Sequence, residues 1–379
     1  MNILHIYSEW KWTGPSEPIF NLCAGLKQQG HNVFVACLEA PDDVKKTTLP
    51  GRLRERGMEL VPLRSLGKLT FLFALWDNIN RIEKFISRHG IDIIHAHSSL
   101  DHFIAAKAVR HLQVKPKIVC TNHKGIPLLP SLITNWLIKQ KTDGYITLSR
   151  TLLLIDRQNF NLPIERSWFI EGAVDINRFN TESVKKNMRP ELGISIDDLV
   201  IGVIARVQRH RRFEIILSSF AKLIKEFPNL KLLIIGRGTY QDEVLVNPVK
   251  EMGIERNIIH IKQRLNDNDY VEHLAVMDFG VFLVPGSDGS CRAVREMMAM
   301  GKTVIVSMQG VLPEIIENNI TGLVIEDTVE NLTQAIRSLI TNRSLIAKYG
   351  ISARNQASNN FDITAQVKRI GEIYRVLLA

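Results

Sequence analysis

Cysteine is scarce in this sequence, and long apolar runs are lacking. The four cysteines lie far apart, at Cys23, Cys37, Cys120 and Cys291. This spacing suggests neither a zinc ribbon nor a disulfide scaffold and fits a reducing compartment. The first residues read as a strand, without the basic segment and apolar core of a signal peptide. The most aromatic apolar stretch, residues 66–76, falls well short of the ~20 residues that span a bilayer. These absences predict a cytoplasmic protein without a membrane span.

Signatures of nucleic-acid binding are also missing, although the chain is basic. With 379 residues, 45% of them hydrophobic, the sequence has the size and composition of a two-domain globular protein. Its net charge is +9, and most of this excess falls within residues 1–181. A basic half could face anionic lipid, acidic glycan or nucleic acid. Because neither helix-turn-helix spacing nor an RNP-like aromatic strand occurs, we expect no nucleic-acid partner.

Strand-like apolar runs alternate with helical patterns in two series. The first series lies at residues 3–7, 33–37, 60–62, 91–95, 117–121 and 144–147. The second lies at residues 200–205, 231–235, 258–262, 279–284, 303–307 and 322–325. Residues 176–197, between the two series, lose the apolar period and are predicted to hold the linker. Twelve strands separated by helices predict two parallel α/β domains with the ligand between them.

The most informative segment of the chain is residues 279–326. An apolar run ends at Pro285 and Gly286, and good helix formers then follow from Arg292. Asp288 therefore stands at a helix entrance, and Glu296 lies within that helix. A helix start attracts anions, and a carboxylate on each side can accept hydroxyls, so the pattern suits a sugar nucleotide. The alternative is a capped helix with a solvated glutamate.

Four arginines gather where a predicted strand ends and a helix begins. They are Arg206, Arg209, Arg211 and Arg212. Because a guanidinium group matches two phosphate oxygens at once, the cluster suits a pyrophosphate and its negative charge. The same four arginines could equally form a charged, solvent-exposed surface that binds no ligand.

Histidine and tryptophan mark the predicted acceptor half. His95, His97 and His123 stand at two neighbouring strand ends, but no carboxylate or cysteine accompanies them at ligand spacing, so no metal site is expected. Each histidine could instead be structural, which is the preferred interpretation for His95. Trp10 and Trp12 could stack on a sugar or rest on lipid, although packing is the commoner fate of tryptophan.

These segments resemble the motifs of glycosyltransferase family 4, also called glycosyl transferases group 1. The resemblance is carried by Asp288-Gly-Ser-Cys with Glu296 eight positions on, and by Arg206 and Arg211 in place of a Gly-Arg-x-x-x-x-Lys-Gly element. The family usually has Glu-Gly-Phe-Gly where this chain has Asp288-Gly289-Ser290-Cys291, and lysine where it has Arg211. The resemblance implies the GT-B fold, an α/β architecture of two Rossmann-like parallel-sheet domains that face each other across a cleft.

The resemblance also implies domain limits and site residues. It implies an acceptor-side domain at residues 1–181, onto which a helix at 363–379 packs back, and a sugar-nucleotide domain at 182–362. The implied catalytic residues are Arg206, Arg211, His123 and Asp288. The implied donor-binding residues are Gly14, Glu17, Gly236, Gly238, Arg264, Gly289, Ser290, Cys291, Arg292 and Glu296. His97 and Trp12 would contact the acceptor, and neither a metal nor another cofactor is expected.

A retaining glycosyltransferase is the function that this resemblance implies. It would move a hexose or related sugar from a nucleotide-sugar to a glycan or lipid-linked glycan, in cell-surface polysaccharide or lipopolysaccharide synthesis. The expected location is cytoplasmic, with peripheral contact to the anionic inner face of the membrane as an option. Two alternatives stay open. One is a non-hydrolysing sugar-nucleotide epimerase, and the other is a non-catalytic sugar-nucleotide-binding protein.

Overall fold

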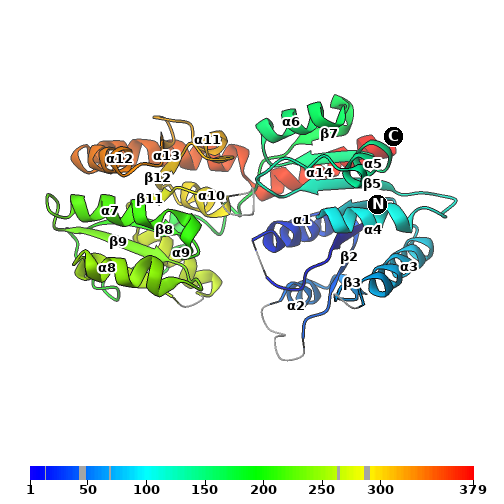
Figure 1. The fold of residues 1–379 in the computed structure, drawn as a ribbon, viewed down its shortest axis with the longest axis horizontal. Helices are drawn as coiled ribbons and strands as arrows, with labels where there is room; N and C mark the ends of the chain where they lie inside the picture. Colours follow the sequence, from blue (N-terminus) through cyan, green and yellow to red (C-terminus); the bar gives the residue numbers. More distant parts are fainter. Residues whose placement is uncertain (13, 42–47, 68–69, 263–264, 286–290) are drawn as a thin grey trace. The chain divides into compact units, whose positions relative to one another are not determined.

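The chain forms two compact units, each with its own parallel sheet. The computed structural model describes residues 1–12, 14–41, 48–67, 70–262, 265–285 and 291–379 (Figure 1). Unit 1 holds residues 1–172 and 363–379, and unit 2 holds the described residues between 173 and 362. Among the described helices, none is both long enough and apolar enough to cross a bilayer.

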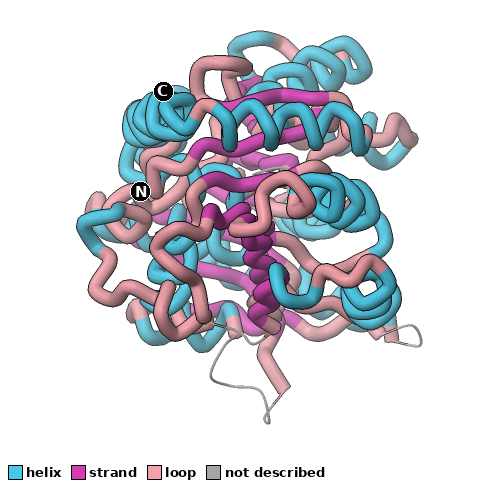
Figure 2. Tube along the Cα trace, turned by 90° about the vertical axis from the view of Figure 1, so that its left-hand side faces the viewer, coloured by secondary structure: helices cyan, strands magenta, loops and turns pink. Residues whose placement is uncertain are grey.

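Unit 1 is built on a seven-stranded sheet in the order β3-β2-β1-β4-β5-β6-β7. The strands are β1 (Asn2–Tyr7), β2 (Asn32–Leu38), β3 (Glu59–Leu63), β4 (Ile93–Ala96), β5 (Lys117–Asn122), β6 (Gly144–Thr147) and β7 (Ser167–Phe169). The helices are α1 (Ser16–Gln28), α2 (Leu49–Glu55), α3 (Phe71–His89), α4 (Ser99–Ala108), α5 (Leu132–Gln140), α6 (Arg150–Phe160) and α14 (Ile363–Leu378). Because the central strands carry helices on both faces, they are buried and almost wholly apolar (Figures 1 and 2).

Helix α14 completes the core of unit 1 from far along the chain. Its buried residues Val367, Ile370 and Tyr374 join the cluster that also contains Ile3 of β1. The helix packs closely on α1 at Gly25, where a Cβ atom would lie 2.6 Å from a methyl carbon of Val367. Glycine is therefore required at this helix contact.

Unit 2 is built on a six-stranded sheet in the order β10-β9-β8-β11-β12-β13. The strands are β8 (Leu199–Ile204), β9 (Leu230–Ile235), β10 (Ile258–Ile261), β11 (Phe279–Phe282), β12 (Thr303–Ser307) and β13 (Gly322–Ile325). The helices are α7 (Phe213–Leu223), α8 (Asn247–Glu251), α9 (Asp267–Val276), α10 (Arg292–Ala299), α11 (Leu312–Ile315), α12 (Val329–Thr341) and α13 (Arg343–Asn360). A short 3₁₀ turn, η4 (Arg209–Arg211), precedes α7.

The chain enters unit 2 earlier than the predicted boundary after residue 181. The backbone N–H of Val174 donates to the carbonyl of Phe361 at 2.8 Å. Phe179 is buried in the core of unit 2, and Arg354 donates to its carbonyl at 2.7 Å. These contacts make the polar stretch that was predicted as linker part of unit 2, and the division falls after Gly172.

The strand order reverses once in each sheet. In unit 1 this point lies between β1 and β4, and in unit 2 it lies between β8 and β11. The crevice outside the carboxyl ends of such strands is where open α/β sheets bind ligands. The predicted arginines of unit 2 follow β8, and His97 of unit 1 follows β4, whereas His95 lies within β4 and His123 follows β5.

Candidate functional site

Arg211 ties the two central strands of the unit 2 sheet together. Its guanidinium donates from Nη1 to the carbonyl of Val284, just beyond β11, at 2.8 Å. Burial lowers the pKa of Arg211, and the nearby positive charge of Arg206 lowers this pKa further, while Cys291 raises it. The Nε atom of Arg211 is buried and has no hydrogen-bond partner among the described residues. A half-buried cation is thus held at the reversal point of the sheet.

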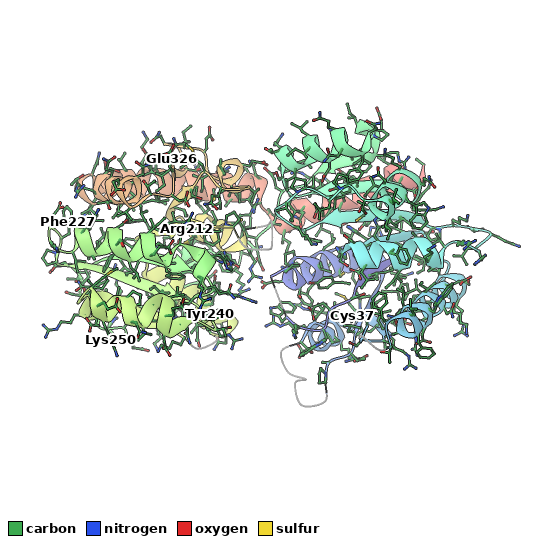
Figure 3. The ribbon with its side chains drawn as sticks, in the orientation of Figure 1. Cys37, Arg212, Phe227, Tyr240, Lys250 and Glu326 are labelled. Atoms are coloured by element: carbon green, nitrogen blue, oxygen red, sulfur yellow. The ribbon has the colours of Figure 1, made fainter. Side chains whose placement is uncertain are left out.

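The four arginines fall into two pairs with different surroundings. Arg209 forms a fork with Glu243 at 2.6 Å and stacks on Tyr240, 4.3 Å from the ring centre. Arg212 forms an ion pair with Asp327 at 3.1 Å. Figure 3 labels Arg212 and Tyr240, the ring on which Arg209 stacks. Within the described ranges no carboxylate pairs with Arg206 or Arg211. The structure thus leaves the two predicted phosphate ligands without an acidic partner there.

The start of α10 has an unusual backbone at Cys291. Its φ of 43° and ψ of 48° are left-handed, a conformation that glycine adopts readily and other residues rarely do. The residue is buried and immediately precedes the helix. The missing second glycine of the motif therefore falls at a position where the backbone favours glycine. The predicted site residues Asp288, Gly289 and Ser290 lie outside the described residues.

Glu296 is buried and already holds two partners. Arg292, one turn earlier, approaches one carboxylate oxygen with its Nε at 2.8 Å. The Tyr270 hydroxyl donates to the other oxygen at 2.6 Å. Because each carboxylate oxygen has one of these partners, the two contacts fix the orientation of the group. Tyr270 was not predicted, because it lies on α9 and meets Glu296 only through the fold.

The glycines after β9 have a clear packing role. A Cβ atom on Gly236 would lie 1.9 Å from the carbonyl oxygen of Ala205, and one on Gly238 would lie 1.7 Å from that of Val207. The loop after β9 therefore lies directly against the loop after β8, which carries Arg206. These residues were predicted to bind the donor, and the close contacts that the structure shows for them are with the chain's own backbone. Arg264 lies outside the described residues.

The histidines of unit 1 form one connected, buried cluster. His97 joins two neighbours, because its Nε2 lies 3.0 Å from Nδ1 of His5 and its Nδ1 lies 2.9 Å from Nε2 of His123. His95 is fully buried, with Tyr374 Oη at 2.5 Å from Nδ1 and Thr121 Oγ1 at 2.6 Å from Nε2. His95 thus has the structural surroundings that were preferred for it.

Burial keeps the inner histidines neutral. It lowers the pKa of His5 to about 3 and that of His97 well below its usual range. Nitrogen atoms of His5, His95 and His97 lie within 4.8 Å of one another, as metal ligands would. However, both nitrogens of His95 have close partners, and its ring stacks on that of His97 at 4.4 Å, so their in-plane lone pairs do not converge. The geometry favours hydrogen bonding within the cluster.

His97 and His123 open onto a cavity within unit 1. The cavity is also lined by Thr121, by Ile19 of α1 and by Gln366 of α14. This arrangement brings His123, predicted as catalytic, and His97, predicted to contact the acceptor, together on one wall. His5 was not predicted, although it pairs with His95 in the register of β1 and β4.

The loop after β1 holds the other predicted residues of unit 1. Gly14 lies in the turn before α1, and Glu17 lies in the first turn of that helix. Trp12 packs edge-on against Phe20 at 5.6 Å, and Arg52 lies 4.2 Å above its ring. The tryptophan is therefore held by neighbours of its own unit, which matches the packing alternative more closely than a free stacking platform.

Asp101 is a buried carboxylate that was not predicted. It lies in the first turn of α4 and accepts the backbone N–H of Ser8, just after β1, at 2.9 Å. Burial raises the pKa of its carboxyl to about 6. The side chain thereby fixes the beginning of the loop that leads to Gly14.

Two family models match the chain, and together they cover most of it. The model described as Glycosyltransferase Family 4 matches residues 14–178, and the model described as Glycosyl transferases group 1 matches residues 184–356. The chain belongs to glycosyltransferase family 4. Its two parallel sheets form a GT-B fold, and this family 4 member is a glycosyltransferase.

Known relatives of this family 4 glycosyltransferase differ in what they glycosylate. The chain is 27% identical over 308 residues to N-acetyl-alpha-D-glucosaminyl L-malate synthase of Bacillus anthracis, covering 78% of this chain and 77% of that protein. It is 22% identical over 307 residues to UDP-Gal:alpha-D-GlcNAc-diphosphoundecaprenol alpha-1,3-galactosyltransferase of Escherichia coli, covering 77% of each. Among solved structures, HepE of Anabaena in complex with UDP matches with a TM-score of 0.81 and 17% identity, covering 98% of this chain and 99% of that one.

Proposed function

We propose that this glycosyltransferase moves a hexose or related sugar from a nucleotide-sugar to a glycan or lipid-linked glycan, with retention of anomeric configuration. The observation that carries the donor half is the contrast among the four arginines. Arg209 and Arg212 have carboxylate partners, whereas Arg206 and Arg211 have none among the described residues. Two such guanidinium groups beside a helix start suit the diphosphate of a donor.

In this proposal catalysis is chiefly electrostatic. The acceptor hydroxyl attacks the anomeric carbon from the side of the leaving group, and the departing phosphate takes the hydroxyl proton. Negative charge then grows on the diphosphate as its bond to the sugar breaks. Arg206 and Arg211 stabilise this charge, and the half-buried position of Arg211 strengthens its effect because the surroundings are less polar than water.

Uridine nucleotides are the donors to test first. The matching Anabaena structure contains UDP, and the Escherichia coli relative uses a UDP-sugar by its name. We propose the same nucleotide class here, with Glu296 accepting ribose hydroxyls while Arg292 and Tyr270 hold its carboxylate.

Nucleotide binding tests the donor proposal directly. A ligand that binds only the folded state raises the melting temperature, so UDP and UDP-sugars should raise it more than GDP or ADP. The shift should be lost in Arg211→Ala and kept in Arg209→Ala, a matched control whose arginine is occupied by Glu243. Equal shifts in the two variants would contradict the proposed phosphate site. NMR of the transfer product tests retention, because the transferred sugar should keep the anomeric configuration that it had in the donor. Isomerisation of the donor in the absence of an acceptor would instead indicate the epimerase.

Exposed apolar side chains support a lipid-linked acceptor. Phe73 and Trp76 on α3 are 67% and 62% exposed, and Leu72, which immediately precedes Phe73, is 71% exposed. A second exposed apolar group follows β5 at Ile126, Leu129, Leu132 and Ile133. Because α3 follows β3 and the sheet is parallel, both groups start from the carboxyl edge of the same sheet. Aromatic side chains on a basic domain suit the interface of an anionic membrane, so we place the enzyme peripherally at its cytoplasmic face.

Vesicle binding tests this surface. Phe73→Ser combined with Trp76→Ser should weaken binding to vesicles with anionic lipid by about tenfold or more, since each change removes buried apolar area at the interface. Leu154→Ser on α6 is a matched control, because this leucine is 64% exposed and lies outside both apolar groups. Equal binding by the double variant and the wild type would assign the aromatic residues another role.

A further inference from the structure

Arg212 has a backbone conformation that residues with a Cβ atom rarely adopt. Its φ of 59° and ψ of 33° are left-handed. Among the described residues, the other non-glycine residues with positive φ are Asn161, Cys291 and Asn319, and asparagine tolerates this conformation better than most side chains. Arg212 stands where the Gly-Arg-x-x-x-x-Lys-Gly element ends in glycine. An arginine therefore occupies a backbone position that suits glycine, immediately after Arg211.

The left-handed residue separates two anchored neighbours. Before it, Arg211 ends the 3₁₀ turn η4, and its Nη1 donates to the carbonyl of Val284 at 2.8 Å. After it, Phe213 begins α7 and is fully buried. Because Arg212 is the one residue between them, its φ and ψ determine where Arg211 lies relative to the start of α7.

The side chain of Arg212 is held by residues from a distant part of the sequence. Its Nε lies 3.1 Å from Oδ2 of Asp327, just beyond β13. Gln309, beyond β12, donates from Nε2 to the same oxygen at 2.7 Å. The side chain of Asp327 is 24% exposed, whereas that of Glu214, 3.5 Å from Arg212, is 58% exposed. Since water screens exposed ion pairs most strongly, Asp327 is the stronger carboxylate partner.

We propose that Asp327 is a positioning residue of the donor site, which holds Arg212 in its left-handed conformation and thereby fixes Arg211 for the diphosphate. This inference rests on the proposed function, in which Arg211 binds that diphosphate. The ion pair offsets the cost of a Cβ atom at a backbone position that favours glycine. A chain with glycine at position 212 would not need this partner, because glycine adopts the conformation without strain.

The contact between α7 and α12 provides a matched control. Asp327 lies just before α12, and Arg212 lies just before α7. A second ion pair joins the same two helices beyond the opposite end of α7, where Glu226 Oε1 lies 2.7 Å from Arg337 Nη2. Glu226→Ala therefore removes an ion pair between these helices without touching Arg212.

Amide hydrogen exchange in the absence of substrate tests the conformational step. The backbone N–H groups of Ile215 and Ile216 donate to the carbonyl of Arg212 at 3.1 and 3.3 Å. Asp327→Ala should speed the exchange of these two amides by about tenfold, because the first turn of α7 opens more readily once Arg212 is released. In an Arg212→Gly background, the same change should have little effect on their exchange. Glu226→Ala should leave the exchange of both amides unchanged.

UDP binding and sugar transfer test the functional step. Asp327→Ala should weaken UDP binding in titration calorimetry and lower kcat, each by about tenfold, because misplacing a charge-stabilising group lowers the rate. The double variant Arg212→Gly with Asp327→Ala should recover both quantities to within about twofold of the wild type, since the two residues act as a pair. A merely structural ion pair would change the melting temperature and leave UDP binding and kcat as they are.

Three results would overturn the proposal. Equal exchange of the Ile215 and Ile216 amides in the wild type and in Asp327→Ala would show that Arg212 keeps its conformation without the ion pair. Normal UDP binding and kcat despite faster exchange would show that the phosphate site does not depend on this turn. A loss of UDP binding that persists in the double variant would show that Asp327 does not act through Arg212.

Hydrogen exchange also separates this proposal from the proposed function. The exchange rates are measured without a nucleotide, so they report the hold of Asp327 on Arg212 whether or not UDP is the donor nucleotide. Failure of UDP to bind the wild type, together with the expected exchange pattern, would count against the proposed donor site and not against this hold.

Discussion

The two arginines proposed to bind the donor in unit 2 are charged, whereas the buried histidines His5, His95 and His97 of unit 1 are neutral because burial lowers their pKa values. Arg206 and Arg211 have no carboxylate partner among the described residues, while His5, His95 and His97 have one another or nearby hydroxyls. In the proposed function, this difference corresponds to the different needs of a diphosphate and of sugar hydroxyls. A leaving diphosphate needs positive charge in its transition state, and sugar hydroxyls need donors and acceptors of fixed direction.

Replacing Arg206 or Arg211 should have the largest effect on the rate of sugar transfer. Arg206→Ala and Arg211→Ala should each lower kcat by about 10²–10³-fold, as loss of one electrostatic contact to a leaving group does. Arg211→Lys should keep part of the activity, since lysine retains the charge but not the guanidinium fork. Arg209→Ala should stay within about twofold of the wild type in the same transfer assay. Comparable losses in all three alanine variants would remove the distinction between the two arginine pairs.

Acid should destabilise unit 1 through its neutral histidines. The folded-state pKa of His5 is about 3, against 6.5 ordinarily, so below pH 6.5 the unfolded chain binds a proton that the folded chain does not. The free energy of unfolding is therefore highest above pH 6.5 and decreases as the pH falls toward 3. At pH 4 the neutral His5 alone lowers it by about 3 kcal/mol. His97 and His102, whose pKa values are also lowered, act in the same direction.

Urea unfolding at a series of pH values measures this loss. His5→Asn removes the titrating group and should flatten the dependence between pH 6.5 and 4, even if it lowers the stability at pH 7. An unchanged slope in the variant would show that His5 is protonated in the folded state.

Asp101 should act in the opposite direction and more weakly. Burial raises its pKa from 3.8 to about 6, so the unfolded chain loses this proton first as the pH rises. Stability is therefore lost between pH 4 and 6 and stays lower above pH 6. Asp101→Asn retains an oxygen for the Ser8 N–H and should stabilise the protein at pH 7 by about 1–2 kcal/mol. Destabilisation at pH 7 with no change at pH 4 would show that the charged carboxylate is favoured in the fold.

Backbone strain at Cys291 gives the smallest expected effect. A left-handed conformation costs a residue with a Cβ atom about 1 kcal/mol relative to glycine. Cys291→Gly and Cys291→Ala both remove the thiol, so their difference isolates the backbone. The glycine variant should be more stable than the alanine variant by about that amount in thermal unfolding. A more stable alanine variant would place the strain elsewhere.

Much of the fold could be predicted from apolar runs. The twelve predicted strands all occur, because each buried strand of a parallel sheet is apolar over several residues. The thirteenth, β7, was missed since it spans only Ser167–Phe169. The domain boundary was placed too late because a polar composition resembles a linker even where Val174 and Phe179 anchor the segment in unit 2.

The site was less predictable where it depends on contacts distant in sequence. Arg206 and Arg211 could be found from their spacing, yet that spacing does not show that Glu243 and Asp327 occupy the other two arginines. His5 joins the histidine cluster only because β1 pairs with β4, and no local sequence pattern predicts that pairing. Asp101 resembles an ordinary residue in the first turn of a helix until its contact with Ser8 is known.

Helix α14 has a consequence for how the protein is made. It supplies Ile370, Ile373 and Tyr374 to the core of unit 1, yet it leaves the ribosome only after the whole of unit 2. The nascent first 172 residues therefore expose an apolar face on α1 until translation has passed Tyr374. At the ordinary pace of synthesis, about 5–20 residues per second, this interval lasts on the order of ten seconds or more. Unit 2 can complete its core first, and the N-terminal unit is the one whose core waits for the last helix to be made.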